Sequence, residues 1–242
     1  MDRAEFLERL EEDSLLLGEA AARDMTAAVP FCAGWTVRDA VEHVAEVYEH
    51  KIAAVKRRGE RPEPWPPTWP EDRDPLAWFS DARARLLDVL ARTDPAAPSW
   101  TWWPPDQTAG FWVRRMAQET AVHRVDVQGA TGTATPVDAQ LAVDGIDEVL
   151  LLMFHGDWTV DPQPGLTGTV NVVTSGSIWR VAMTRDEVTV VAGGGAADAT
   201  ITAEPSPLLL WLWGRAGDEA VDVSGSHEAA ARLRQRLALA TQ

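Results

Sequence analysis

The fold class of this chain is decided by residues 167–183, TGTVNVVTSGSIWRVAM. In residues 167–174 and 177–183, apolar side chains alternate with polar or small ones, and this period of two is typical of β-strands. Ser175-Gly176, which separates the two runs, fits a two-residue hairpin turn. The stretch therefore predicts a β-hairpin. The elements expected after it are strands over 188–192, 199–203 and 220–223, and helices over 207–215 and 228–240.

Before Pro162 the apolar residues recur at helical spacing. Thr36, followed three residues later by Asp39, is typical of a helix start, because the threonine side chain caps the first turn. Residues 59–74 carry several prolines around Trp65 and Trp69, which excludes a helix there and predicts a long connector. Helices are expected over 2–27, 36–58, 75–92, 111–130 and 138–155.

The change of period from helix to strand predicts an α+β chain with two domains. A helical bundle is expected over residues 1–155 and a small α+β domain over residues 163–242, with the boundary near 156–164. The 242 residues are 45% hydrophobic and 24% charged, which is the balance of a globular protein with room for both domains.

The composition excludes several classes of partner. The net charge of −15 repels phosphate backbones and anionic lipid headgroups, so neither nucleic acid nor a membrane surface is expected as a partner. Cys32 is the single cysteine and cannot form an internal disulfide, and the N-terminal residues lack a signal-peptide pattern, so a reducing cytoplasm is expected. Lysine occurs only at positions 51 and 56 and arginine supplies the other cations, which favours a GC-rich bacterial genome.

A possible metal site is indicated by Glu119 and His123, which lie four residues apart on one face of the helix expected over 111–130. His43 lies in an apolar stretch of another predicted helix, where an imidazole needs a partner. His50 lies two turns further along, about 10 Å away, so His43 and His50 do not share one ion. Two histidines and one glutamate leave an open position, as in catalytic zinc sites.

Each of these residues also has an ordinary structural interpretation. His43 can be a buried histidine bonded to a carboxylate, Glu119 included, and Arg115 can pair with Glu119. Asp126 is placed to orient the His123 ring, whereas Cys32 is expected to be a small packed residue. His155 and His227, at predicted helix ends, are expected to be structural or solvated.

Tryptophan occurs 12 times, which predicts a large apolar core or a lined cavity. Four tryptophans precede the Glu119 stretch, and we hypothesise that some of them wall the entrance to the site, with core packing as the alternative for each. These are Trp100, Trp102, Trp103 and Trp112.

The sequence resembles the mycothiol-dependent maleylpyruvate isomerase family along nearly the whole chain. The residues that carry the resemblance are PFCAGWTVRD (30–39) leading to His43, RMAQETAVHRVD (115–126), ADATITA (197–203) and LWGR (212–215). The resemblance implies a DinB-like four-helix-type bundle followed by a sterol-carrier-like α+β domain. It also implies metal ligation by His43, Glu119 and His123. Gln118 stands where the family often has histidine, at a position outside the three ligands.

The resemblance further implies a reaction. Zn²⁺ or another divalent metal holds the sulfur of mycothiol as a thiolate, which adds to a small electrophile, and a cis-enedioate adduct can rotate before sulfur leaves. Arg215 is the expected substrate anchor, because a carboxylate substrate suits a bidentate guanidinium donor. Two alternatives stay open at this stage: a mycothiol S-transferase, and a non-catalytic carrier of an apolar ligand. Neither the electrophile nor the oligomeric state is specified by the sequence.

Overall fold

The computed structural model describes residues 1–66 and 73–241 of the chain. Trp69 and the neighbouring part of the predicted proline-rich connector lie outside these residues. The chain divides into two compact units, Met1–Thr135 and Pro136–Gln242. The α+β class predicted from the sequence is confirmed, because the first unit is helical and the second contains a mixed sheet.

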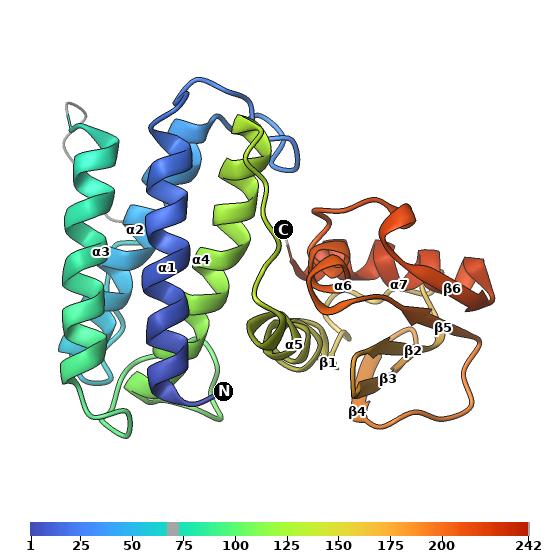
Figure 1. Cartoon of the computed structure of the whole chain (residues 1–242). Coiled ribbons are helices and arrows are strands. Elements are labelled where there is room, and N and C mark those ends of the chain that lie inside the picture. The colour runs from blue at the N-terminus through green and yellow to red at the C-terminus, as the bar shows by residue number, and fades with distance from the viewer. Residues whose placement is uncertain (67–72, 242) are drawn as a thin grey trace. The chain divides into compact units, whose positions relative to one another are not determined.

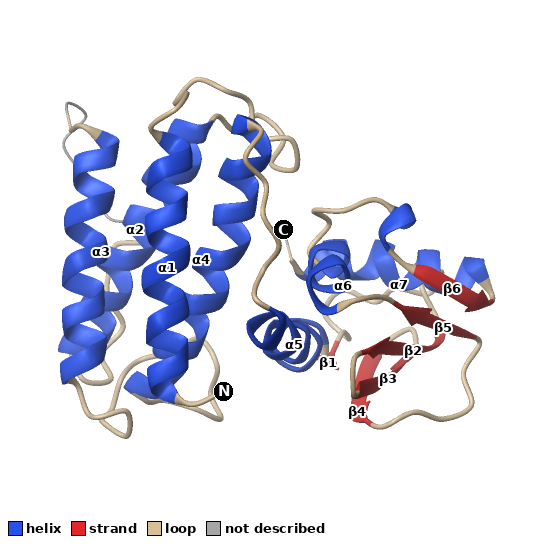
Figure 2. Ribbon diagram, viewed as in Figure 1, coloured by secondary structure: helices blue, strands red, loops and turns tan. Residues whose placement is uncertain are grey.

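The helices of the first unit follow the predicted pattern (Figures 1 and 2). They are α1 (Arg3–Ala21), α2 (Val37–Lys56), α3 (Pro75–Arg92) and α4 (Ala109–Thr131). Helix α2 begins where the sequence indicated: the Thr36 side chain accepts from the Asp39 amide, and the Asp39 carboxylate accepts from the Thr36 amide. Helix α4 ends at Gly132, whose φ of 70° lies in the left-handed region that favours glycine.

The core of the first unit forms between paired helices. Helix α1 packs along α4, and α2 packs against α3. Two buried polar contacts link the helices: Arg124 Nε lies 3.0 Å from Asp13 Oδ1, and Tyr48 Oη lies 2.6 Å from Thr120 Oγ1. Because a buried polar group is costly without a partner, these contacts fix the register of α4 against α1 and α2.

The second unit is built on one mixed sheet. Its strands are β1 (Gly156–Asp157), β2 (Gly168–Thr174), β3 (Ser177–Met183), β4 (Glu187–Ala192), β5 (Ala199–Thr202) and β6 (Asp222–Gly225). They lie in the order β1-β4-β3-β2-β5-β6, with β2 and β5 parallel and every other neighbouring pair antiparallel. The predicted hairpin is β2–β3, in which Thr174 pairs with Ser177 around Gly176, whose φ is 77°.

Helices complete the second unit. Helix α6 (Pro205–Leu212) and a 3₁₀ turn, η2 (Asp218–Ala220), precede β6, and α7 (His227–Ala240) packs across β2 and β5. Leu233 and Leu237 of α7 are buried in this contact region, as the predicted terminal helix requires. Strand β1 was not predicted, because two residues are too few to show a period.

The helix that precedes the predicted domain boundary lies in the second compact unit. The helix expected over 138–155 exists as α5 (Ala139–Glu148), continued by the π-helix η1 (Val149–Phe154), but it belongs to the second unit rather than to the bundle. It packs against α6, and the Val137 amide donates to Ser206 Oγ at 2.9 Å. The two compact units are thus divided after residue 135, whereas the sequence predicts a domain boundary near 156–164. Periodicity identified the helix, but it carries no information on which neighbour the apolar face meets.

One further expectation, for His155, is answered by this fold. His155 is structural, because its Nδ1 accepts from the Val190 amide at 3.0 Å and so connects the end of η1 to β4. Among the described residues, no helix has a stretch that is both long and apolar enough to cross a bilayer.

Candidate metal centre

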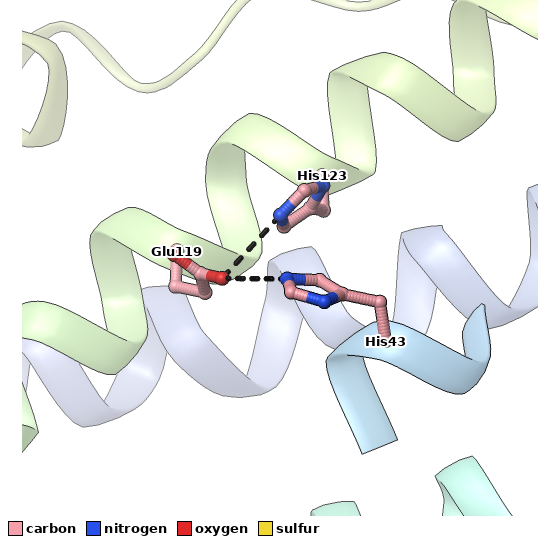
Figure 3. Close-up of side chains that lie close together, drawn as sticks. All are labelled: His43, Glu119 and His123. Carbon is pink, nitrogen blue, oxygen red and sulfur yellow. Dashed lines mark ion pairs between the residues drawn. The ribbon is translucent and has the colours of Figure 1, made fainter. Parts of the chain in front are cut away.

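Three of the predicted site residues converge in the first unit (Figure 3). His43 extends from α2, while Glu119 and His123 extend from successive turns of α4. Nε2 of His43 lies 3.4 Å from Glu119 Oε1, and Nε2 of His123 lies 3.3 Å from the same oxygen. One candidate ligand atom from each of the three residues lies within 4.8 Å of the others. Both histidines therefore direct Nε2 at a single carboxylate oxygen.

The two helices run in opposite directions past each other at this point. His43, near the start of α2, meets His123, whereas Lys51, near its end, lies beside Trp112 at the start of α4. Spacings of three and four residues place Trp112, Arg115, Glu119 and His123 on one stripe of α4. The stripe faces α2, which explains why residues 76 positions apart or more share one site.

The charge of Glu119 is stabilised from its other oxygen. Arg115, one turn earlier on α4, donates to Oε2, so Oε1 is the oxygen that faces the histidines. Burial raises the pKa of Glu119, but the Arg115 charge and the hydrogen bonds from both imidazoles bring that pKa well below its usual range. The carboxylate is therefore ionised at neutral pH and available as a ligand.

Asp126 fixes the orientation of His123. Its Oδ2 lies 3.1 Å from His123 Nδ1, so Nδ1 carries a proton toward Asp126 and Nε2 faces the cluster. Burial lowers the pKa of His123, but hydrogen bonds and charge from Asp126 and Glu119 outweigh it and raise the pKa to about 9. A metal ion bound at Nε2 at neutral pH must therefore displace a proton.

Trp35 contacts both histidines of the cluster, and Cys32 contacts Asp126, which orients His123. The Trp35 ring stacks on His123, with centroids 6.2 Å apart and an interplanar angle of 14°, and its centroid is 5.1 Å from that of His43. Cys32 Sγ lies 3.6 Å from Asp126 Oδ2, so the thiol donates to the residue that orients His123. In the sequence, Trp35 stands out only as part of the motif over 30–39, because nothing in its spacing indicates the histidines it contacts.

The donor set fits a divalent ion such as zinc. Two imidazole nitrogens and a carboxylate oxygen form the ligand set of an open zinc site. A tetrahedral ion with bonds of about 2.1 Å separates its ligands by about 3.4 Å, and the two measured nitrogen–oxygen separations are 3.4 and 3.3 Å. His43 is the most exposed of the three side chains, at 30%, so solvent approaches the cluster from its side.

The remaining sequence candidates lie outside this cluster. His50 contacts Lys51, with Nδ1 and Nζ 3.0 Å apart, and is not part of the group that offers metal ligands. Trp112 is fully buried and its Nε1 lies 3.1 Å from Ser99 Oγ and 2.9 Å from the Trp100 carbonyl oxygen, so it has the core role that was the alternative for each tryptophan. Trp102, by contrast, is 37% exposed and packs on Phe111.

Arg215, the predicted substrate anchor, follows α6 in the second unit. Its amide donates to the Leu210 carbonyl at 2.7 Å, and its Nη1 donates to the Trp213 carbonyl at 2.8 Å. These bonds shape the end of α6 around Gly214, whose φ is 75°.

Comparison with known proteins finds one matching family and several similar solved structures. The family described as mycothiol maleylpyruvate isomerase N-terminal domain matches residues 7–128. The crystal structure of the mycothiol-dependent maleylpyruvate isomerase matches with a TM-score of 0.64 and 16% identity, over 93% of this chain and 95% of its own. That of a histidine-to-alanine mutant matches over the same shares, at 15% identity and a TM-score of 0.65.

A third solved structure matches only part of the chain. Sterol carrier protein 2 like 2 from Aedes aegypti is similar over 40% of this chain and 98% of its own, at 16% identity and a TM-score of 0.31. No curated protein matches by sequence.

Proposed function

The chain belongs to the family of the mycothiol maleylpyruvate isomerase N-terminal domain, and we propose that it is a metal- and mycothiol-dependent enzyme acting on a small electrophile. The reaction that we propose is a cis–trans isomerisation, and the family description, which names a maleylpyruvate isomerase, supports an isomerase. The observation that carries the proposal is the convergence of His43, Glu119 and His123 on one point, with a donor set that leaves a position open.

The roles of the residues follow from their contacts. His43 and His123 each offer Nε2 and Glu119 offers Oε1, while Asp126 holds His123 in the required tautomer. When bound, a divalent metal such as zinc supplies the positive charge that keeps a coordinating thiol ionised at neutral pH. Arg115 keeps the carboxylate ionised and positioned through its other oxygen. The chain itself supplies only Cys32 as a thiol, so the reacting sulfur is assigned to mycothiol.

The proposed chemistry is reversible addition of that sulfur. A thiolate forms a carbon–sulfur bond to one carbon of an activated double bond, whose electron pair moves to the conjugated carbonyl. The former double bond is then single and rotates. Expulsion of the thiolate re-forms the double bond in the trans arrangement, so the thiol is regenerated and no other reactant is consumed. We place Arg215 as the group that binds a substrate carboxylate.

The experiment compares metal content and thiol dependence in one set of proteins. Wild type, His43→Ala and Glu119→Gln are loaded with zinc, and maleylpyruvate isomerisation and thiol consumption are assayed with and without mycothiol. We expect one zinc per wild-type chain, lost in both variants together with mycothiol-dependent turnover. His227→Ala is the matched control, because His227 is a histidine at the start of α7 in the second unit.

Each outcome of this assay has a distinct meaning. Catalytic use of mycothiol supports the isomerase, whereas stoichiometric consumption of thiol identifies an S-transferase. If zinc-loaded wild type is indifferent to mycothiol in both assays, the enzyme proposal is wrong and a carrier of apolar ligands is favoured. Retention of zinc by His43→Ala would contradict the ligand assignment.

A further inference from the structure

A buried lysine lies on the same face of the bundle as the histidine–glutamate cluster. Lys51 is on α2, eight residues after His43, and only 9% of it is exposed. Among residues 1–66 and 73–241, no carboxylate forms an ion pair with Lys51; its Nζ instead lies 4.9 Å from the ring centroid of Trp65 and 4.7 Å from that of Trp112. A buried cation without a counter-charge is costly, so its retention calls for an explanation.

Within the described part of the chain, the hydrogen-bond partner of Lys51 is neutral. His50 Nδ1 lies 3.0 Å from Lys51 Nζ, and the Pro62 carbonyl accepts a hydrogen bond from the same imidazole ring. The ring nitrogen that faces Pro62 must carry the proton, so Nδ1 is the acceptor for a Lys51 N–H. Burial, followed by the Lys51 charge, lowers the pKa of His50 to about 4, so His50 is uncharged at neutral pH. The histidine therefore orients the ammonium group and does not neutralise it.

The nearest acid is already occupied. Glu119 is close enough for its charge to act on Lys51, but one of its oxygens binds Arg115 and the other faces His43 and His123. Arg115 adds a second positive charge on the facing helix. Two cations, Lys51 and Arg115, thus face one carboxylate, that of Glu119. This local balance contrasts with the net charge of −15 of the whole chain.

Aromatic rings surround Lys51 and its neighbour His50. Three indoles surround the His50–Lys51 pair: Trp65 and Trp112 flank Lys51, and Trp100 lies edge-on to His50 with centroids 5.6 Å apart. Trp65 is the outer member, 41% exposed, so this end of the cluster reaches the surface. Trp112 is fully buried and forms the base of this group, so Trp65 is the ring that a ligand can meet. A flat apolar ring beside a cation suits a planar organic anion better than inorganic phosphate, because the body of the organic anion can stack on Trp65 while its charge is paired.

We propose that Lys51, flanked by Trp65 and Trp112, is a carboxylate-binding subsite that selects a planar unsaturated acid as the electrophile. The proposal rests on the proposed function, because it assigns the substrate class of that site, and it adds a recognition residue on α2 of the bundle to the one proposed at Arg215. Lys51 contacts Trp112, which lies on the same stripe of α4 as Glu119, two turns earlier and so about 10 Å away along the helix. A planar acid of about that length, with its carboxylate on Lys51 Nζ, can place its unsaturated carbons beside the cluster.

The test measures binding separately from turnover. The probes are cinnamate, a planar unsaturated carboxylate, and cinnamamide, which has the same body without the charge; both are titrated into the zinc-loaded full chain by tryptophan fluorescence. Lys51→Met removes the charge and keeps the length, and Lys51→Arg keeps the charge. Lys56→Met is the matched control, because Lys56 is the other lysine of the chain, exposed in the last turn of α2.

We expect Lys51→Met to weaken cinnamate binding about tenfold or more, as the loss of a charge-assisted hydrogen bond predicts. Cinnamamide binding, zinc content and the Lys56→Met protein should match wild type, and Lys51→Arg should retain most of the cinnamate affinity. The subsite is wrong if wild type does not bind cinnamate saturably, if Lys51→Met binds it like wild type, or if cinnamate and cinnamamide weaken equally. If Lys51→Met fails to fold, Lys51→Arg decides: retained affinity supports the subsite and full loss overturns it.

The proposed function can fail independently of this result. Cinnamate binding that depends on Lys51, in a protein whose turnover ignores mycothiol, would leave the anion subsite standing and remove the thiol-dependent enzyme. If mycothiol-dependent turnover and cinnamate binding are both unchanged in Lys51→Met, the anion subsite is wrong and the thiol-dependent enzyme is supported.

Discussion

Arg115 and Glu119 form an ion pair one turn apart on α4, and this pair leaves one carboxylate oxygen, Oε1, facing the two histidines. Both side chains are largely buried, at 7% and 15% exposed. The guanidinium thus has two effects: it keeps the carboxylate charged, and it determines which oxygen is presented to a ligand.

Removing Arg115 should destabilise the zinc-free protein. In Arg115→Met the buried Glu119 charge loses its cation, which should cost about 3 kcal/mol of unfolding free energy, measured by urea denaturation. Glu119→Gln in the same background should restore part of that loss, because the amide carries no charge. The double variant should therefore depart from additivity by about 1 to 3 kcal/mol. Additive single effects would show that the pair contributes no coupling.

Asp126→Asn should weaken zinc binding without removing it. The amide accepts less strongly from His123 Nδ1, so the orientation and basicity of the imidazole are lost in part, and affinity should fall about 10- to 100-fold. Competition with a chelator of known affinity gives this value directly. Asp88→Asn on the exposed face of α3 is the control and should bind zinc like wild type. Equal zinc affinity in both variants would mean that Asp126 does not support the ligand.

Alanine substitutions at Trp112 and Trp103 should have different effects, the first on stability and the second on turnover. Trp112 is fully buried, so Trp112→Ala should lower the unfolding free energy by about 3 to 5 kcal/mol. Trp103, which packs against Trp102 at a centroid distance of 6.3 Å, should on substitution by alanine alter substrate turnover more than melting temperature. Melting curves and kcat/KM on both variants check this contrast. A large stability loss with unchanged kinetics in Trp103→Ala would make it a core residue.

His50 should make the protein less stable in acid. Its pKa is about 4 in the folded chain against 6.5 in an unfolded one, so between these values the unfolded chain binds a proton that the folded chain does not. Stability at this residue is therefore present above pH 6.5 and lost as pH falls toward 4. Lys51, Arg61 and Arg57 all act on the ring in the same direction.

Melting temperatures between pH 4 and 7 measure this effect. His50→Asn should show a shallower fall than wild type, and His227→Asn should keep the wild-type slope, since no comparable burial applies at the start of α7. Parallel curves for His50→Asn and wild type would show that this imidazole does not titrate in the unfolding transition.

Arg215→Ala should weaken binding of a carboxylate substrate while zinc content stays at the wild-type level. The reason is that a guanidinium pairs with a carboxylate, whereas the metal ligands that we propose all lie in the other unit. The readout is KM for maleylpyruvate, expected to rise about tenfold, beside zinc per chain. Arg185→Ala, at an exposed position, is the control. An unchanged KM would remove Arg215 from the substrate site.

Local pattern was sufficient for most elements of the fold. The helical spacing before residue 155, the cap at Thr36 and the alternation around Ser175-Gly176 depend on neighbours within a few residues, and the corresponding helices and hairpin are present. The i, i+4 spacing of Glu119 and His123 likewise required only that α4 be a helix. Spacing alone does not indicate that α5 groups with the second unit, since the partner of an apolar face depends on packing over long range.

The sequence by itself determined which segments are helices and which are strands, and it placed Glu119 and His123 on one face of α4. The resemblance of its motifs to a family added His43 to these two residues. Only the tertiary structure decided which charges meet. The antiparallel pass of α2 and α4 brings His43 to Glu119 and sets Lys51 among the indoles of Trp65 and Trp112. No sequence spacing encodes these contacts, because each joins side chains whose distance depends on how two helices pack. The burial that gives Lys51 and Glu119 their properties arises only when that packing has formed.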